Sequence, residues 1–479
     1  MADNLNGSIV KGVSWNLIET LVSYLVQFVI GIVLARLLTP HDYGLIGVVN
    51  IFIIISAAFV KAGFGQAYIR KADADARDAS TVFYINLGIS LVFYAILFFT
   101  APYIATYFHQ QQLVSIVRIL GLVVIVNALN VIQIAIIRKN LLFKKKAIVA
   151  IVSVVLSGIG GILCAYNGMG VWSLVVQQLL SKLIYCILLY IKSPWYPGLD
   201  FSRSSARSMF SYGSWLLLSE VLTTIMNNFY RFVIGHRYPA YELGLYDRAK
   251  QFQAIIADTF TGVFGMVAFP TLAKIQHDKE QMFGMTRNYV RYSSLVIFPL
   301  LCCLMVVAEP LIVILITDKW LPCVPYLQVF CIVGMAVPLN FFLSPLLQAA
   351  GMTRMNFIST VITTLLRVIN FVVTFRYGIT ALLWGELCVL LLSVAAVSLI
   401  SRKGLECNYL TVFWDIRWTL LSSCVMLAVG FLLRHWLLDT NLWLQLLLPA
   451  AGMLVAYALL TLLLQRSHVM PLMQYLRRK

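Results

Sequence analysis

Long apolar stretches alternate with short polar segments along almost the whole chain. A helix of about 20 apolar residues spans the hydrocarbon core of a bilayer, and most of these stretches approach or exceed that length. The polar segments between them are too short to fold as separate domains. The pattern therefore predicts an all-α integral membrane protein with fourteen transmembrane helices. The fourteen stretches are Val13–Ala35, Leu45–Val60, Ser80–Pro102, Leu113–Ile137, Ala147–Tyr166, Val171–Ile191, Met209–Ile234, Phe252–Phe269, Tyr292–Val307, Val324–Leu346, Phe357–Phe375, Ile379–Ile400, Trp418–Leu438 and Leu442–Leu464.

The composition agrees with a membrane protein. Hydrophobic residues make up 61% of the chain and charged residues only 11%, which is far from the composition of a soluble domain. The nine cysteines lie mostly inside apolar stretches, and none forms a C-x-x-C pair. Their placement suggests small buried hydrophobic side chains, so we expect no metal, no disulfide and no cofactor.

The formal net charge of +17 first suggests a nucleic-acid partner, but the distribution of the charges favours another explanation. If the N-terminus lies in the cytoplasm and every stretch crosses once, most of the 36 Lys and Arg residues fall in cytoplasmic loops and ends. This bias is the positive-inside rule. It predicts that both termini are cytoplasmic, and it favours contact with anionic membrane lipids instead of nucleic acid.

The first and seventh stretches are related by an internal repeat. A shift of 200 positions places Ser14–Trp15 on Ser214–Trp215 and Asp42–Leu45 on Glu242–Leu245. The repeated unit holds six spans, an even number, so both copies face the same way. We therefore expect two six-helix bundles related by a pseudo-two-fold axis along the membrane normal, a common plan for alternating-access transporters. The predicted division is an N-terminal bundle at residues 1–208, a C-terminal bundle at 209–402, and two additional helices with a basic cytoplasmic tail at 403–479.

Four segments resemble those of a known family. They are Ala35–Gly44, Gly168–Leu174, Glu309–Gln328 and Gln348–Arg354. In their order and spacing they are similar to the polysaccharide transporters, or Wzx-like flippases, of the multidrug/oligosaccharidyl-lipid/polysaccharide (MOP) exporter superfamily. The resemblance implies movement of an undecaprenyl-pyrophosphate-linked oligosaccharide from the cytoplasmic to the outer leaflet of the bacterial inner membrane. It also implies that the chain has no catalytic residues. We expect the alternating-access cycle to be driven by a proton or sodium ion or by the membrane potential.

Four acidic residues lie inside the predicted spans, namely Glu19, Glu220, Asp258 and Glu386. An ionised side chain at membrane depth is costly unless it faces a watery cavity or a partner. We interpret these four as ion-coupling sites, and the alternative is a carboxyl group hydrogen-bonded to a neighbouring helix. Glu19 and Glu220 are one place from equivalence in the repeat, which favours a coupling role for that pair.

The pyrophosphate of such a substrate requires cations, and Arg offers a rigid fork of donors. The resemblance implies that spans one, two, seven and eight line a central cleft. The basic residues best placed to bind the substrate there are Lys61, Arg231, Arg248 and Lys250. Arg367 is central in its span and is a fifth candidate, with neutralisation of one of the four acids as the alternative. The segment Arg138–Lys146 either holds headgroups at the cytoplasmic face or only fixes topology. Sugar contacts or helix packing are alternatives for Asn50, Asn127, Asn130, Gln133, Trp215, Asn227, Asn228 and Tyr230.

Two other functional classes are alternatives. A multidrug/cation antiporter of the same superfamily usually has twelve spans and an acid-lined cleft, whereas the added Arg and Lys residues favour an anionic substrate. A membrane enzyme of polysaccharide assembly needs donor-binding or acid/base groups, and the D-x-D pattern at Asp73–Asp75 lies in a charged turn. We therefore expect a monomeric transporter, not an enzyme, with lipid-linked oligosaccharide as substrate and a polysaccharide polymerase among its partners.

Overall fold

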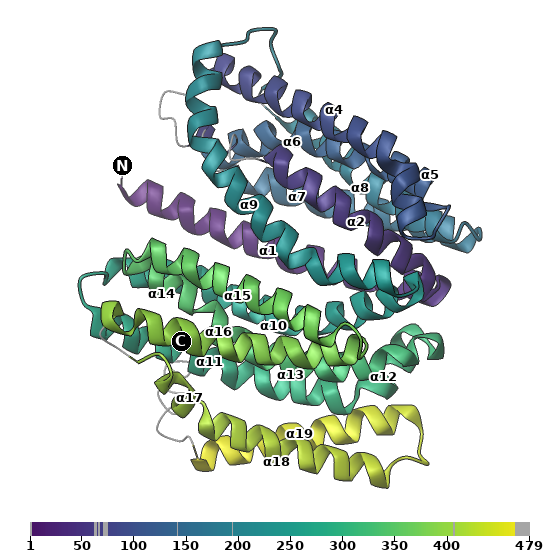
Figure 1. The fold of residues 1–479 in the computed structure, drawn as a ribbon, viewed down its shortest axis with the longest axis vertical. Coiled ribbons are helices and arrows are strands. Elements are labelled where there is room, and N and C mark those ends of the chain that lie inside the picture. The colour runs from purple at the N-terminus through teal and green to yellow at the C-terminus, as the bar shows by residue number, and fades with distance from the viewer. Residues whose placement is uncertain are drawn as a thin grey trace. The chain divides into compact units, whose positions relative to one another are not determined.

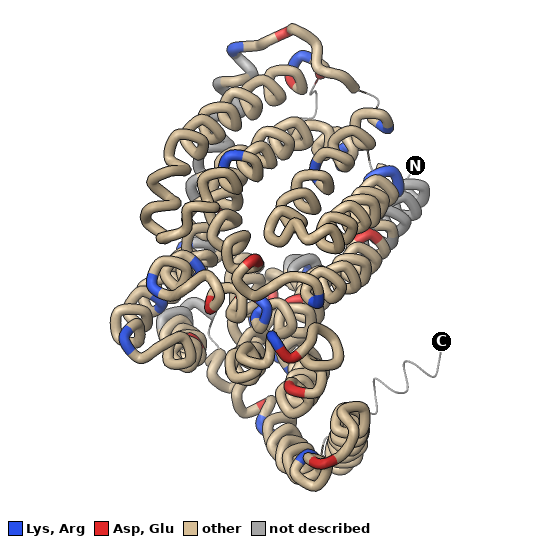
Figure 2. Tube along the Cα trace, turned by 90° about the vertical axis from the view of Figure 1, so that its right-hand side faces the viewer, with Lys and Arg blue, Asp and Glu red and all other residues tan. Residues whose placement is uncertain are grey.

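The computed structural model describes residues 2–61, 65, 68–69, 75–140, 142–193, 195–405 and 408–464. Helices dominate this described part of the chain, and no strand occurs in it (Figure 1). The helices divide into two compact units, Met1–Gly244 (unit 1) and Leu245–Lys479 (unit 2). Charged residues occur at only a few positions along the helices (Figure 2), as expected for segments that face lipid.

Local signals in the sequence explain where individual helices begin. Pro40 is the first residue of α2 (Pro40–Lys61), where its missing N–H costs nothing. The carboxylate of Asp42 accepts hydrogen bonds from the backbone N–H and the hydroxyl of Thr39. A reciprocal capping box opens α4 (Ala76–Tyr107), because Asp75 and Asp78 each accept the backbone N–H of the other.

Unit 1 is a bundle in which α7 packs between α1 and α8. The strongest pairings join α7 with α8 and α1 with α7, while α2 packs against both α6 and α9. The helices of unit 1 are α1 (Ala2–Leu37), α2, α4, α5 (Leu113–Leu120), α6 (Leu122–Lys139), α7 (Phe143–Tyr166), α8 (Val171–Lys192) and α9 (Arg203–Arg237).

Glycines on α7 allow its two neighbours to approach closely. A Cβ atom built on Gly158 would lie 2.0 Å from Cδ1 of Ile30 on α1, and one on Gly161 would lie 2.6 Å from the Cβ atom of Gln177 on α8. A larger residue at either position would require the side chain of Ile30 or Gln177 to move. These glycines therefore serve close contact between helices.

Unit 2 has a core in which α11 is central. Buried apolar side chains of α10, α11, α13, α14 and α16 form one cluster around Phe298 and Phe342. The helices of this part of the chain are α10 (Ala240–Lys274), whose first turn belongs to unit 1, α11 (Lys279–Val306), α12 (Ala308–Ile316), the 3-10 helix η1 (Asp318–Cys323), α13 (Val324–Phe341), α14 (Leu343–Ala349), α15 (Thr353–Thr374), α16 (Ile379–Leu405), α17 (Thr411–Asp415), α18 (Arg417–Trp436) and α19 (Leu442–Leu464).

The two additional helices, α18 and α19, form a hairpin that packs on α11 (Figure 1). Tyr457 of α19 donates a hydrogen bond of 3.0 Å from its hydroxyl to the backbone carbonyl of Leu295. Arg434 of α18 donates to the carbonyl of Val306 at 3.0 Å and pairs with the carboxylate of Glu309. These contacts attach the hairpin to the C-terminal half of α11 and the start of α12.

A second ion-pair cluster, the Asp415 clamp, joins α17 to the first half of α11. Arg287 donates from Nε and Nη2 to the two carboxylate oxygens of Asp415, both at 2.5 Å, and Arg291 donates at 3.2 Å. Burial would raise the pKa of Asp415, but the hydrogen bonds and charges of Arg287 and Arg291 outweigh it and lower that pKa. The carboxylate therefore stabilises unit 2 in its ionised form.

Each of the fourteen predicted stretches lies within one helix or two consecutive helices, and none extends more than two residues beyond them. Many of the helices are longer than the stretches, such as α10, which begins 12 residues before the eighth stretch. Among the described residues, twelve helices are long and apolar enough to cross a membrane. The helices α9 and α10 are not among these twelve, although each is 35 residues long. The chain is therefore a multi-pass membrane protein, and the number of fourteen crossings stays a prediction.

Two stretches that we expected to be continuous are broken. The fourth divides at Gly121 into α5 and α6, and the tenth divides at Phe342 into α13 and α14. Pro345 has no N–H to donate to the carbonyl of Phe341, which explains the second break. A glycine, with its weak helix preference, stands at the first.

The internal repeat has a reciprocal contact as its structural counterpart. A Cβ atom on Gly44 would lie 1.7 Å from the carbonyl oxygen of Ala240, and one on Gly244 would lie 1.9 Å from the carbonyl oxygen of Pro40. The two contacts interchange under the shift of 200 positions, and all four residues belong to unit 1. This reciprocity supports the repeat. The predicted division at residue 208 stays a prediction, and α9 packs within unit 1.

Candidate functional site

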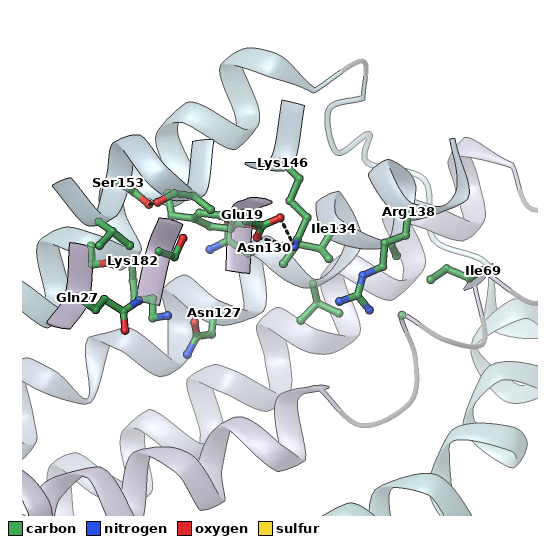
Figure 3. A pocket seen from close by; sticks show the side chains of 18 residues that line it. Glu19, Gln27, Ile69, Asn127, Asn130, Ile134, Arg138, Lys146, Ser153 and Lys182 are labelled. Atoms are coloured by element: carbon green, nitrogen blue, oxygen red, sulfur yellow. Dashed lines mark hydrogen bonds and ion pairs between the residues drawn. The ribbon is translucent and has the colours of Figure 1, made fainter. Parts of the chain in front are cut away.

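A cavity of about 570 Å³ lies inside unit 1, between α1, α6, α7 and α8. Figure 3 shows the 18 residues that line it. Its lining includes four ionisable residues other than tyrosine and seven uncharged residues with a hydroxyl or amide group. Because these helices are otherwise apolar, so much polar surface in one place marks a site for a polar ligand.

The polar lining comes from one face of each helix. On α1, Glu19, Ser23 and Gln27 are four residues apart, which places them one above another on the same face. The face of α6 that lines the cavity carries Asn127, Asn130, Ile134 and Arg138, at intervals of three and four residues. With a rise of 1.5 Å per residue, these stripes extend about 12 Å along α1 and about 16 Å along α6. The polar lining therefore extends over about two to three helical turns.

An ion pair stands within the cavity. Nζ of Lys146, in the first turn of α7, donates to Oε1 of Glu19 at 2.7 Å and to Oε2 at 2.9 Å (Figure 3). The side chains of Lys146 and Glu19 are only 14% and 13% exposed. Removal of one partner from a buried pair leaves an uncompensated charge, which costs about 3–5 kcal/mol. The ammonium group of Lys144 lies 5.4 Å from the ring centre of Trp15, a second contact between α7 and α1.

Two further cations line the cavity. In Figure 3 the side chains of Arg138 and Lys182 lie on opposite sides of the Glu19–Lys146 pair. Three cations and one carboxylate give the lining a formal net charge of +2. Apolar helices around them reduce the screening by water, so the cavity attracts anions strongly.

Two hydrogen-bonding atoms of the lining residues are buried and lack a partner among the described residues. They are Oγ of Ser23 and Oδ1 of Asn130, and Asn130 is only 4% exposed. Buried polar atoms in folded proteins are nearly always paired with protein or water. An amide oxygen accepts hydrogen bonds, so Asn130 suits a ligand with hydroxyl groups.

The structure separates the four predicted ion-coupling acids. Glu19 lines the cavity, whereas Glu220 on α9 and Asp258 on α10 are exposed. Glu386 on α16 is buried and accepts hydrogen bonds at 3.1 and 2.9 Å from Nε and Nη2 of Arg367 on α15. Arg367 is thus paired with one of the four acids, as in the alternative to a phosphate contact that the sequence analysis gave.

The other predicted substrate-binding residues have separate environments. Arg231 donates to Oδ1 of Asn228, one turn earlier on α9, at 3.2 Å. Arg248 is 5% exposed, and its guanidinium group lies 5.0 Å from the ring centre of Trp320. Lys250 is half-buried on α10. The side chain of Lys61 lies outside the described part of the structure, so its predicted role in substrate binding stays a prediction.

The cavity contains basic residues to which the sequence analysis gave less weight. Arg138 and Lys146 lie between the predicted spans, at the two ends of the segment Arg138–Lys146. In the structure they belong to α6 and α7, and the connection between these helices is only the segment 140–142. Lys182 is in the middle of α8. The sequence signal that identifies the site is the polar stripe on α1 and α6, since its spacing of three and four residues is visible without the structure.

Two solved structures with a similar fold are membrane transporters. One is the lipid II flippase MurJ in an inward closed conformation, which covers 95% of this chain and 100% of its own with a TM-score of 0.74 and 13% identity. Another is a multidrug resistance MATE family transporter of the MOP superfamily in an inward-facing conformation, with 80% and 94% coverage, a TM-score of 0.62 and 18% identity. The chain thus has the all-α fold of this class of transporters.

Sequence comparisons give the family. A family model for polysaccharide biosynthesis proteins matches residues 33–325, more than half of the chain. The chain belongs to this family. The succinoglycan biosynthesis transport protein ExoT of Rhizobium meliloti is 25% identical over 96% of this chain and 94% of its own length. The lipopolysaccharide biosynthesis protein WzxC of Escherichia coli is 23% identical over 95% and 88%. The resemblance to polysaccharide transporters is confirmed.

Proposed function

We propose that the protein is a flippase that moves a lipid-linked oligosaccharide, joined to its lipid through pyrophosphate, across the membrane. One observation carries the proposal, namely the cationic cavity between apolar helices of unit 1. A pyrophosphate cannot enter hydrocarbon without compensating charge, because an unpaired buried ion is very costly. Arg138, Lys146 and Lys182 offer that compensation, and the family makes polysaccharide precursors the natural cargo.

The depth of the cavity suits the two chemical parts of this substrate. In the predicted topology α6 ends and α7 begins on the cytoplasmic side, so Arg138 and Lys146 stand near the cytoplasmic leaflet. Asn127, Asn130 and Gln27 lie deeper, about two to three helical turns away. Amide groups there suit sugar hydroxyls, while the basic residues suit phosphate oxygens.

The remaining predicted roles are part of the same proposal. Arg231, Arg248, Lys250, Lys61 and Arg367 stay candidates for contacts with the substrate along its path. Carboxylates that change protonation or bind sodium would couple the cycle to an ion gradient, with Glu19, Glu220, Asp258 and Glu386 as the candidates. We place the protein in the bacterial inner membrane, as a monomer with both termini in the cytoplasm and a polysaccharide polymerase as a partner downstream.

The charge of the cavity argues against the first alternative, and the descriptions of the relatives argue against the second. A multidrug antiporter that exports organic cations needs an anionic or apolar cleft, and here the cavity has a net positive lining. An assembly enzyme needs a donor-binding or acid/base site. The relatives are described as transport and biosynthesis proteins, and transport of the lipid-linked precursor satisfies both descriptions.

Reconstitution tests the function directly. Purified protein is inserted into liposomes that contain a fluorescent lipid-linked oligosaccharide, and a membrane-impermeant quencher reports the fraction in the outer leaflet. We expect the native protein to accelerate exchange between leaflets, and Arg138→Gln to reduce the rate at least tenfold. Lys192→Gln, an exposed cation at the end of α8 outside the cavity, is the matched control and should exchange lipid like the native protein. Exchange no faster than in protein-free liposomes would refute the proposal.

A further inference from the structure

We infer that Glu19 is an internal competitor of the substrate, occupying on Lys146 the position that a phosphate group takes when the substrate binds. This inference rests on the proposed function, because it assigns a role in the transport cycle to one residue of the same cavity. Binding then exchanges one anion for another on Lys146, and release restores the original pair.

The geometry of the pair is that of an anion site already filled. Both carboxylate oxygens of Glu19 accept from the one ammonium group, at 2.7 and 2.9 Å. Two non-bridging oxygens of a phosphate group present the same arrangement of acceptors to a lysine. The pair is mostly buried, so Lys146 would be poorly solvated if Glu19 left without a replacement. A phosphate that arrives as Glu19 departs avoids this penalty.

The charges of cavity and substrate are complementary only when Glu19 is counted. A pyrophosphate that links a lipid to a sugar carries about two negative charges, one on each phosphate. The lining has a formal net charge of +2 with Glu19 ionised. The occupied cavity is then neutral overall. Without the Glu19 charge the cavity holds an excess cation, and the substrate is held more tightly.

Arg138 and Lys182 allow the exchange to proceed. They lie on either side of the pair in Figure 3, so a diphosphate that displaces Glu19 still has a second cation within the same cavity. Glu19 in turn stays within a cavity of positive potential after its displacement, and it is at hand to recover Lys146. The competitor therefore lowers substrate affinity and promotes release.

Direct binding measurements test the inference. The protein is placed in nanodiscs of neutral phosphatidylcholine, and binding of inorganic pyrophosphate is measured by calorimetry for the native protein and for Glu19→Gln. We expect Glu19→Gln to bind pyrophosphate about tenfold more tightly, a difference of 1.4 kcal/mol. Lys146→Gln should bind at least tenfold more weakly than the native protein, and the double variant should not exceed Lys146→Gln. Unchanged or weaker binding by Glu19→Gln would overturn the inference, as would an absence of binding by both proteins.

Two controls separate this effect from others. Asp200→Asn removes an exposed negative charge of unit 1 outside the cavity, and it should bind pyrophosphate like the native protein. Equal gains in the two variants would reduce the effect to net charge and overturn the inference. If Glu19→Gln fails to fold, Glu19→Asp shortens the carboxylate reach and should give an intermediate gain. Phosphatidylglycerol in the nanodisc should compete weakly, and displacement as strong as by pyrophosphate would assign the cavity to a phospholipid headgroup instead.

The leaflet assay keeps this inference distinct from the proposed function. We expect Glu19→Gln to saturate at a lower substrate concentration but to exchange lipid more slowly, because release limits the cycle. A native protein that exchanges the lipid, with no gain of affinity in Glu19→Gln, would refute the competitor role alone. Tighter pyrophosphate binding by Glu19→Gln without any lipid exchange by the native protein would refute the proposed function alone.

Discussion

The ion pair between Arg367 and Glu386 allows a stability prediction with a definite size. Nε and Nη2 of Arg367 both donate to Oε1 of Glu386, and the side chains are 25% and 11% exposed. Removal of one partner from a buried pair costs about 3–5 kcal/mol. Because a quarter of the Arg367 side chain reaches the surface, the lower end applies, and we expect Glu386→Leu to destabilise the protein by about 3 kcal/mol.

Replacement of both partners should be far less damaging. In Arg367→Leu/Glu386→Leu no charge is left unpaired, and such double replacements are often nearly neutral. The double-mutant cycle should therefore give a coupling energy of about 2–3 kcal/mol between Arg367 and Glu386. The free energy of unfolding can be measured in mixed micelles by titration with SDS, followed by tryptophan fluorescence. Single variants within about 0.5 kcal/mol of the native protein, or additive losses in the double variant, would refute the pairing.

The same variants decide whether Arg367 also contacts the substrate. If neutralisation of Glu386 is its whole role, the double variant should exchange the lipid-linked oligosaccharide at close to the native rate. If Arg367 grips phosphate, the double variant should remain folded and lose exchange. Arg367→Lys can supply one ammonium group where the guanidinium supplies two donors, so we expect it to lose about 1 kcal/mol of stability.

Three further predictions follow from contacts outside the cavity. The pKa of Asp415 is lowered in the folded protein, so its stabilising contribution is complete above the ordinary pKa of 3.8 and is lost as the pH falls below it. The free energy of unfolding should therefore fall less on acidification in Asp415→Asn than in the native protein, and an equal fall would contradict the clamp. Gly44→Ala should destabilise by more than about 2 kcal/mol because its Cβ atom meets backbone, whereas Gly262→Ala, which meets no atom within 4 Å, should stabilise by up to about 1 kcal/mol in the same SDS titration. Cysteines at Asn140 and Asn167, at opposite ends of α7, should react with an impermeant maleimide from the cytoplasmic and the outer side respectively, and the reverse pattern would invert the topology.

The helices could be predicted from the sequence because a membrane leaves few alternatives. Backbone groups in lipid must be paired within the segment, so each apolar stretch of sufficient length becomes a helix. The breaks at Gly121 and Phe342 were missed since the apolar run continues through both. A proline after Phe342 gave a usable signal, but a single glycine inside a helix did not.

The candidate site was harder to predict because it depends on which helix faces meet. Glu19 was recognised as a costly charge, but its partner Lys146 is 127 residues away and stands in a run of three lysines that is typical of a topology signal. Nothing in the spacing selects one lysine of that run. The sequence indicated that Arg367 could neutralise an acid. It did not show that this acid is Glu386, because that depends on which faces of α15 and α16 meet.

The reciprocal contact at Gly44 and Gly244 bears on how a chain of this kind can arise and change. Pro40 meets Gly244 as Ala240 meets Gly44, which is the form of contact that a symmetric dimer makes with itself. A chain with one six-helix copy would already hold both sides of this contact, so the fusion of two copies requires no new complementary surface. After fusion the two contacts can diverge independently, but the two residues of each contact must change together. A larger residue at Gly44 requires an adjustment at Ala240, and a change at Gly244 cannot substitute for it.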